Sequence, residues 1–290
     1  MAITLAPFAF SNDDEFPHMP FLNRPHGQIH YDFLDATLPW ITDPPTMLFH
    51  HGVGTDMGTW AGWIRHLCDQ VRVLRMDMVG HGHSSRPDAS QPLSFETLAD
   101  DAHAVLQVVG AKRVILAGES LGGTLMLHMA AMERIKPLAI VTCSTSHLGG
   151  SLENVNAWRR RVAEDGFQAW SDDMMKRRFT DDVITPEMAN WYSRTQASSD
   201  GATILALADL LIGTDLTPQL SDIIAPTLLF APGASPFIPI EVPRKLADAL
   251  PNARLHEFPD MRHGVVFSHA EECATMARAF LIEHGVVRED

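Results

Sequence analysis

The stretch RVILAGESLGG, residues 113–123, decides the fold. Its first five residues, Arg113–Ala117, form an apolar run typical of a buried strand, and helical apolar spacing begins at Leu121 and continues to Met132. Ser120 lies between them with a glycine two residues away on each side. A sharp strand-to-helix turn needs such small neighbours, and the helix N-terminus offers N–H groups to a developing oxyanion. The sequence therefore predicts Ser120 as a nucleophile; the alternative is a chance Gly-x-Ser-x-Gly in a loop.

The same alternation of strand and helix extends in both directions from this turn. Continuous apolar runs separated by single helices indicate a parallel sheet that is covered on both faces, so we predict an α/β fold. The predicted strands are 27–34, 46–50, 71–76, 113–117, 138–142, 226–230 and 254–258, and the predicted helices are 60–68, 95–109, 121–132, 242–250 and 271–284.

The sheet pattern is interrupted once. From about residue 145 to 216 the chain has helical patches dense in charge and no convincing strand. An all-helical insertion in an α/β core often covers the carboxyl ends of the strands. We therefore expect an N-terminal arm at 1–25, a core made of 26–144 and 217–290, and a helical cap at 145–216.

Composition excludes several kinds of partner. The formal net charge is −14, whereas nucleic acids and anionic membranes are bound through basic surfaces. The first residues lack a basic leader and no apolar run reaches 18 residues, so we expect a cytoplasmic protein that acts on a small molecule. The oligomeric state stays open, a homodimer being one alternative. Three widely spaced cysteines fit reduced thiols rather than a disulfide framework: Cys68, Cys143 and Cys273.

Two further motifs fit a serine nucleophile. His51-Gly-Val-Gly54 closes the strand that ends at His50, and its turn would bring the Val53 N–H toward Ser120. Together with the N–H of Leu121, this would supply a two-donor oxyanion hole, while the His51 imidazole itself is expected to be structural. A base must also take the serine proton. Of the fifteen histidines, His263 is the best placed, after the last strand and before the terminal helix.

The histidines do not suggest a metal. His81 and His83 lie in the glycine-rich turn that begins at Asp77, with no carboxylate or cysteine at ligand spacing nearby. We expect Asp77 to bond the backbone of that loop. No metal or other cofactor is predicted.

These motifs resemble the α/β-hydrolase superfamily from about residue 26 to the C-terminus. The motifs that carry this resemblance are Gly118–Gly123, His51-Gly52, Asp77-x-x-Gly-x-Gly-x-Ser84 and His263-Gly264. Within the superfamily, the stretches GVGTDMGTW (52–60) and VLRMDMVGHGHSS (73–85), together with the cap, look most like 3-oxoadipate enol-lactonases. That resemblance implies cofactor-free hydrolysis of a small acidic enol-lactone. The core motifs are shared with esterases, C–C bond hydrolases, dehalogenases and perhydrolases.

The acid of the catalytic triad is missing from its usual place. Laying the family pattern Gly-x-x-Asp-x-x-x-Pro on PGASPFIP puts Ser235 where the aspartate stands. The other location that some members use, at Thr142–Thr145, has no carboxylate either. The nearest acids along the sequence, as substitutes, are Glu241, Asp260 and Glu119.

The sequence thus predicts a serine-dependent hydrolase of a small ester, lactone or activated acyl compound, with Ser120 and His263 and a non-standard or absent acid. Two alternatives remain: C–C bond cleavage or other base-led chemistry in the same pocket, and a ligand-binding protein that has lost turnover. Basic clusters in the cap could clamp a substrate carboxylate or could be solvated helix faces; they contain Arg159, Arg160 and Arg161, and Lys176, Arg177 and Arg178.

Overall fold

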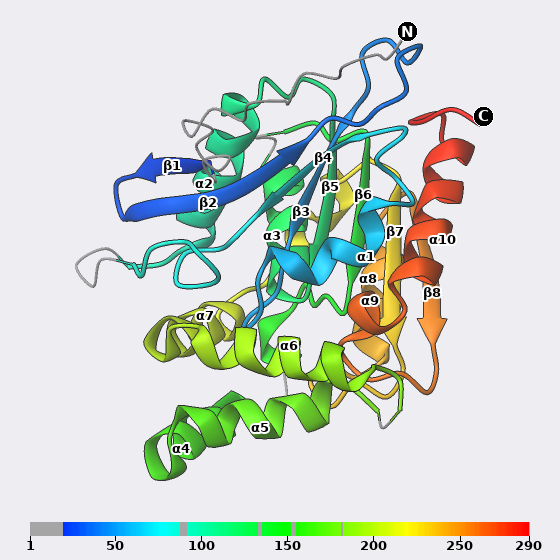
Figure 1. Ribbon diagram of the computed structural model, residues 1–290. Helices are drawn as coiled ribbons and strands as arrows, with labels where there is room; N and C mark the ends of the chain where they lie inside the picture. The colour runs from blue at the N-terminus through cyan, green and yellow to red at the C-terminus, as the bar shows by residue number, and fades with distance from the viewer. Residues whose placement is uncertain (1–19, 88–91, 133–134, 152–154, 181, 290) are drawn as a thin grey trace, which may run out of the picture.

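A computed structural model describes residues 20–87, 92–132, 135–151, 155–180 and 182–289. Eight strands form one sheet in the order β1-β2-β4-β3-β5-β6-β7-β8, in which β4, β3, β5, β6, β7 and β8 are parallel and the β1–β2 hairpin pairs antiparallel with β4 (Figure 1). The predicted α/β fold is confirmed. The strands are β1 (Phe21–Arg24), β2 (Gly27–Leu34), β3 (Thr46–His50), β4 (Arg72–Met76), β5 (Val114–Glu119), β6 (Ala139–Cys143), β7 (Thr227–Pro232) and β8 (Ala253–Phe258).

The central strands are apolar throughout because each of their faces is buried in a different core. In β3, Met47 and Phe49 pack on one side, whereas Leu48 packs on the other. The first side is covered by α1 (Ala61–Ile64), α9 (Val265–Ser268) and α10 (Ala270–Glu283), and the second by α2 (Phe95–Val108), α3 (Leu121–Ala131) and α8 (Glu241–Ala249). This arrangement explains why the strands show continuous rather than alternating hydrophobicity.

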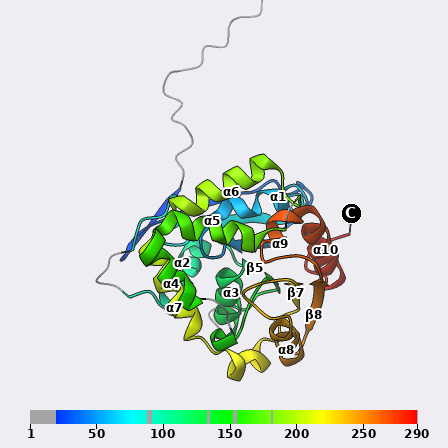
Figure 2. The same ribbon diagram turned by 90° about the horizontal axis from the view of Figure 1, so that it is seen from below.

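Four helices lie across the carboxyl ends of the parallel strands, at the lower end of Figure 1 and in front in Figure 2. They are α4 (Val155–Asp165), α5 (Phe167–Arg178), α6 (Pro186–Ser198) and α7 (Gly201–Ile212). Local capping explains two of their starts: Thr185 caps α6, which has proline in its first turn, and Asp200 caps α7. The helices occupy the stretch for which the sequence predicted a cap.

Two local predictions need correction. Residues 21–24, assigned to the N-terminal arm, form the edge strand β1, while residues 1–19 of that arm lie outside the described residues. The helix predicted at 60–68 is shorter, because a 3₁₀ turn at Met57–Trp60 precedes α1 and turns follow it. Within the described part of the chain, no helix is long and apolar enough to cross a membrane.

Candidate active site

Ser120 lies at the strand-to-helix turn between β5 and α3, as the sequence predicted. Its φ of 55° and ψ of −120° place it in a left-handed region that costs a non-glycine residue about 1–3 kcal/mol. The turn is tight enough to require glycine on both sides. A Cβ on Gly118 would lie 2.4 Å from the Gly122 carbonyl oxygen, and one on Gly122 would lie 2.4 Å from that of His50. The backbone thereby holds the Ser120 hydroxyl above the sheet.

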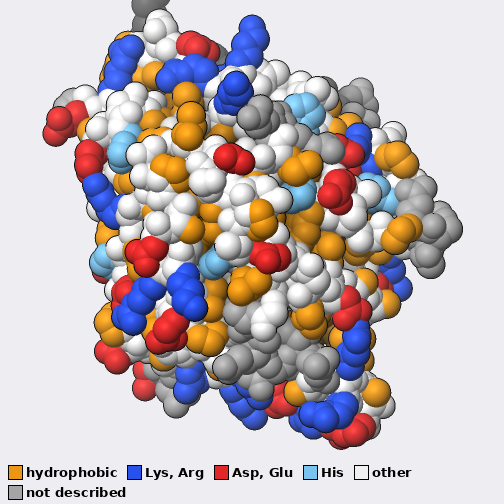
Figure 3. Space-filling model, turned by 180° about the vertical axis from the view of Figure 1, so that it is seen from behind, with side chains coloured by type: hydrophobic (Ala, Val, Ile, Leu, Met, Phe, Trp, Pro, Cys, Tyr) orange, Lys and Arg blue, Asp and Glu red, His pale blue; other side chains and the backbone are white. Residues whose placement is uncertain are grey.

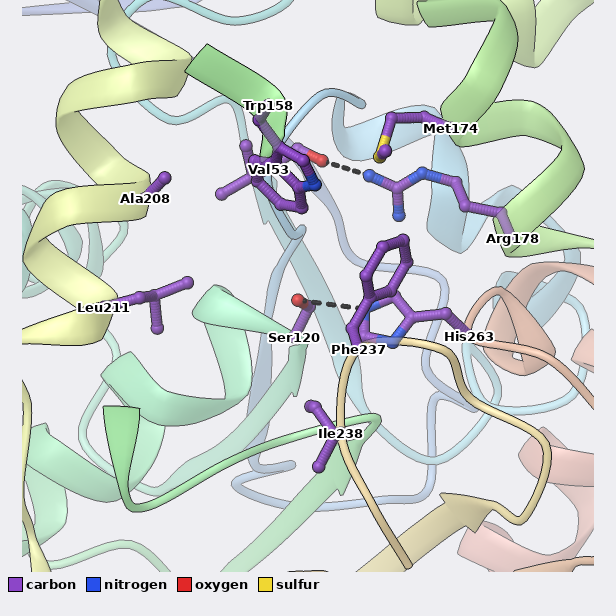
Figure 4. Close-up of a pocket in the computed structure, with 10 residues that line it drawn as sticks. All are labelled: Val53, Ser120, Trp158, Met174, Arg178, Ala208, Leu211, Phe237, Ile238 and His263. Atoms are coloured by element: carbon purple, nitrogen blue, oxygen red, sulfur yellow. Dashed lines mark hydrogen bonds between the residues drawn. The ribbon is translucent and has the colours of Figure 1, made fainter. Parts of the chain in front are cut away.

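His263 reaches Ser120 from the loop between β8 and α9. Its Nε2 lies 3.1 Å from Ser120 Oγ (Figure 4). The loop is held by the Ser144 hydroxyl, which donates to the His263 carbonyl at 2.7 Å, and the ring packs edge-on against Phe237. Burial, together with the smaller effect of the Arg178 guanidinium, lowers the pKa of His263 to about 3. The imidazole is therefore neutral at pH 7 and able to accept a proton.

The other nitrogen of His263 faces Ser235, in the loop after β7. Ser235 Oγ lies 3.2 Å from His263 Nδ1 and also accepts long hydrogen bonds, both 3.4 Å, from the N–H groups of Phe237 and Ile238. A hydroxyl can accept the Nδ1–H, as an aspartate would, or donate its own proton to Nδ1. Ser235 therefore does not fix the imidazole tautomer as a carboxylate does.

None of the three substitute acids takes the position at Nδ1. Glu241, on the first turn of α8, and Asp260 are both exposed to solvent. Glu119 instead lies on the Nε2 side, 3.9 Å from that nitrogen.

The peptide between Gly52 and Val53 is oriented by an imidazole. His51 Nδ1 donates to the Gly52 carbonyl at 2.7 Å, and its Nε2 accepts from the Met78 N–H at 2.9 Å. Since the peptide is trans, the Val53 N–H points away from that carbonyl. Burial lowers the pKa of His51 to about 3, so the ring stays neutral in the tautomer that this bonding requires. The imidazole of His51, expected to be merely structural, thus orients one of the two predicted oxyanion donors; the other, Leu121, is the first residue of α3.

The glycine-rich turn after β4 supports the same loop. Asp77 accepts hydrogen bonds from the N–H groups of Met57 and His83, at 2.9 and 3.0 Å, which agrees with the structural role predicted for it. His81 Nε2 accepts from the Gly54 N–H at 3.0 Å. The described residues contain no group of three or more potential metal ligands.

A narrow pocket with a cavity volume of about 40 Å³ lies beside Ser120 and His263. Its lining is apolar apart from three side chains, Ser120, His263 and Arg178. The other residues are Val53, Trp158, Met174, Ala208, Leu211, Phe237 and Ile238, drawn in Figure 4.

Arg178, the last residue of α5, is the cation of this pocket and is only 5% exposed. Its Nη2 donates to the Val53 carbonyl, and its Nε donates to Gln196 Oε1 at 3.1 Å. The guanidinium also lies over the ring of Tyr192, 5.5 Å from its centroid. Nη1 has no hydrogen-bond partner among the described residues. Nη1 therefore makes no hydrogen bond there, and Glu119 Oε1 lies 3.8 Å from it.

The other arginines proposed as a clamp lie elsewhere. Arg159 pairs with Asp209, and Arg161 pairs with both Asp165 and Asp173. Figure 3 shows such basic and acidic side chains next to one another at the lower end of the molecule, where the cap helices lie. Two arginines remain: Arg160 is exposed, and Arg177 borders a separate hollow between α4 and α5. Of the predicted clamp, only Arg178 lines the pocket.

Glu119 is one of the three acids that the sequence offered as substitutes for the missing aspartate. The carboxyl is 1% exposed, and its Oε1 lies 3.8 Å from Arg178 Nη1. The signal available in the sequence was a charged residue at the end of an otherwise apolar strand, directly before the candidate nucleophile. Gln196 of α6, which orients Arg178, carried no comparable signal.

Comparison with known proteins agrees with this geometry. The family model described as alpha/beta hydrolase fold matches residues 45–270. The 3-oxoadipate enol-lactonase 2 of Acinetobacter baylyi is 26% identical over 250 residues, 81% of this chain and 90% of that protein. The 2-hydroxy-6-oxononadienedioate/2-hydroxy-6-oxononatrienedioate hydrolase of Paraburkholderia xenovorans is 25% identical over 254 residues, 81% of this chain and 86% of that protein.

A solved structure gives the same fold. The enol-lactonase from Burkholderia xenovorans LB400 superposes with a TM-score of 0.80 and 23% identity, covering 90% of this chain and 99% of that one. The family match spans well over half of the sequence and includes Ser120 and His263. The chain therefore belongs to the alpha/beta hydrolase fold family.

Proposed function

We propose that this protein hydrolyses a small ester or lactone that carries a carboxylate, with Ser120 as nucleophile and His263 as base. The observation that carries the proposal is the hydrogen-bonded series Ser120–His263–Ser235 beside an apolar pocket in which Arg178 is the one cationic side chain among the described lining residues. The names of the similar proteins include a lactonase and a hydrolase of a dicarboxylic substrate, which agrees with this class.

The reaction follows from the positions of these groups. Ser120 Oγ attacks the carbonyl carbon as its proton passes to His263 Nε2, while the N–H groups of Val53 and Leu121 stabilise the oxyanion. The bond to the leaving oxygen breaks as His263 returns the proton to that oxygen. Water then attacks the acyl carbon as its proton passes to His263, and His263 returns that proton to Ser120 Oγ as the acyl–oxygen bond breaks and the acid leaves.

Arg178 supplies substrate selectivity in this proposal. A guanidinium keeps its charge when buried, and its unused Nη1 can donate to a carboxylate oxygen. The apolar walls would hold the carbon skeleton between that carboxylate and Ser120. Esters without a carboxylate should therefore be poorer substrates than those that carry one.

A matched pair of aryl esters tests both parts. Ser120→Ala should abolish hydrolysis of 4-nitrophenyl acetate and of mono-4-nitrophenyl succinate. Arg178→Gln should lower kcat/KM for the succinate ester about 10²-fold more than for the acetate ester, the loss expected for a hydrogen bond between charged groups. Arg160→Gln, an exposed arginine on α4, is the control. Equal turnover by wild type and Ser120→Ala would refute the hydrolase; equal losses for both esters would refute the clamp.

One observation favours C–C bond cleavage as a second candidate. Because Ser235 also accepts from two N–H groups, its own proton is free to go to His263 Nδ1, which would leave the Nε2–H tautomer facing Ser120. Such a tautomer suits proton transfer to a substrate carbon more than activation of the serine. A Ser120 adduct trapped with the true substrate would count against this candidate.

Turnover that disappears in His263→Ala would exclude a protein that only binds its ligand.

A further inference from the structure

Glu119 is a buried carboxyl group without an ordinary partner. It ends β5 and is 1% exposed, and neither oxygen makes a hydrogen bond of normal geometry with the described residues. Its space is created by a glycine, because a Cβ on Gly52 would lie 2.1 Å from Glu119 Oε2. Burying a carboxyl group without hydrogen bonds destabilises the fold, so its surroundings should show what the group does.

Those surroundings are the catalytic base and the pocket cation. Glu119 Oε1 lies 3.9 Å from His263 Nε2 and 3.8 Å from Arg178 Nη1. Two other titratable groups lie near it. Besides burial, the charge of Glu119 contributes to the raised pKa of Cys143, its partner on β6, and to that of Tyr192 on α6. Glu119 is therefore the acidic group of this cluster.

The proposed reaction makes such a charge necessary. When Ser120 gives up its proton, His263 becomes a cation in a buried site. Ser235, at Nδ1, is neutral, and the Arg178 guanidinium disfavours a second positive charge. Among the described residues, Glu119 is the carboxylate that lies within ion-pair distance of His263.

We propose that Glu119 carries the negative charge that the triad lacks at residue 235, and that it stabilises protonated His263 beside Arg178. This inference rests on the proposed function. The separation of 3.9 Å is that of an ion pair rather than a hydrogen bond, so the Nε2–H stays free to protonate the leaving group. Glu119 stabilises the charge on His263 and does not contact the substrate, so it is a positioning residue.

The charge state of Glu119 follows the reaction. Burial raises the pKa of Glu119 and outweighs the Arg178 guanidinium and the Gly52 N–H, which both lower it. A proton arriving on His263 adds a second cation next to the carboxylate and favours its ionised form. Because Arg178 offsets the charge of Glu119, the carboxylate does not oppose the oxyanion as strongly as an isolated anion would.

A double-mutant cycle with Ser235 tests the inference. Glu119→Gln should lower kcat for 4-nitrophenyl acetate about 10²-fold, less than the roughly 10⁴-fold cost of removing the acid from a complete triad. Ser235→Asp should change wild-type activity less than 10-fold but should restore at least 10-fold in the Glu119→Gln background. Rescue by a charge on the opposite side of the ring is an effect that a packing role for Glu119 would not produce.

The control is Asp101→Asn, another buried carboxylate, which pairs with Arg24 and His26 far along the chain from the site. It should lower stability and leave kcat unchanged.

Full activity in Glu119→Gln, or a loss that Ser235→Asp does not restore, would overturn the inference. If Glu119→Gln does not fold, a gain of about 10-fold or more from Ser235→Asp alone would overturn it, and a change below 10-fold would support it. Failure of the proposed function is distinguishable, since it would appear as turnover in Ser120→Ala.

Discussion

At Gly52 the backbone passes between Glu119 and the nucleophile. A Cβ there would lie 2.1 Å from Glu119 Oε2 and 2.9 Å from Ser120 Cβ, so Gly52→Ala must displace the carboxyl or the oxyanion peptide. We expect kcat for 4-nitrophenyl acetate to fall at least about 10²-fold, the cost of losing one oxyanion donor. Gly150→Ala is a suitable control, because a Cβ there meets nothing within 4 Å. Steady-state kinetics of both variants check this, and near-normal turnover by Gly52→Ala would contradict it.

The predicted site residues that the structure brings within hydrogen-bond distance of one another share a local cause. Ser120, His263 and Ser235 follow directly on strands or tight turns, so their positions depend on short-range geometry that the sequence records. Arg178 and Glu119 differ from these three residues. They come close to each other only because α5 packs over the carboxyl ends of the strands, and the sequence does not record that packing. The sequence gives no way to tell apart the five arginines of the predicted clamp, and it is burial that separates Arg178 from the others.

At the scale of elements, the β1–β2 hairpin shows what periodicity misses. β1 has four residues, too few for a pattern, and its register depends on the tight turn from Arg24 to Gly27, whose φ is 138°. The hairpin is fixed by Asp101 of α2, which accepts from Arg24 Nε at 2.8 Å and bonds His26 Nε2 at 2.7 Å. These contacts join residues more than 70 positions apart, so neither could be read from local sequence.

Removing that anchor should loosen one edge of the sheet. Asp101→Asn leaves the half-buried Arg24 without its counter-charge and weakens the hydrogen bond to the buried His26, and breaking a buried pair typically costs about 3–5 kcal/mol. We expect a lower free energy of unfolding and faster hydrogen exchange in β1 and β2, with kcat unchanged. Urea unfolding and exchange measurements check this. Protection of the hairpin equal to that of wild type would show that apolar packing alone holds it.

At the scale of the whole molecule, several buried histidines must stay neutral for the fold to persist. Burial lowers the pKa of His50 and His81 to about 4 and that of His51 and His263 to about 3. In the unfolded chain a histidine binds its proton near pH 6.5, so the unfolded state binds more protons below that pH. Stability is therefore complete above about pH 6.5 and falls as the pH drops toward 4.

His81 offers the sharpest test of this dependence. A shift from 6.5 to about 4 corresponds to about 2 kcal/mol lost between pH 7.5 and 5.0 for one histidine. Thermal or urea unfolding of His81→Gln at both pH values should show a smaller difference in the free energy of unfolding than wild type, by up to that amount. His83→Gln, an exposed histidine of the same loop, is the control. If His81→Gln keeps the full wild-type difference, the neutral imidazole that accepts from Gly54 does not contribute to the acid sensitivity. If the difference shrinks, the loop that carries the Val53 N–H is one of the places where acid destabilises the fold.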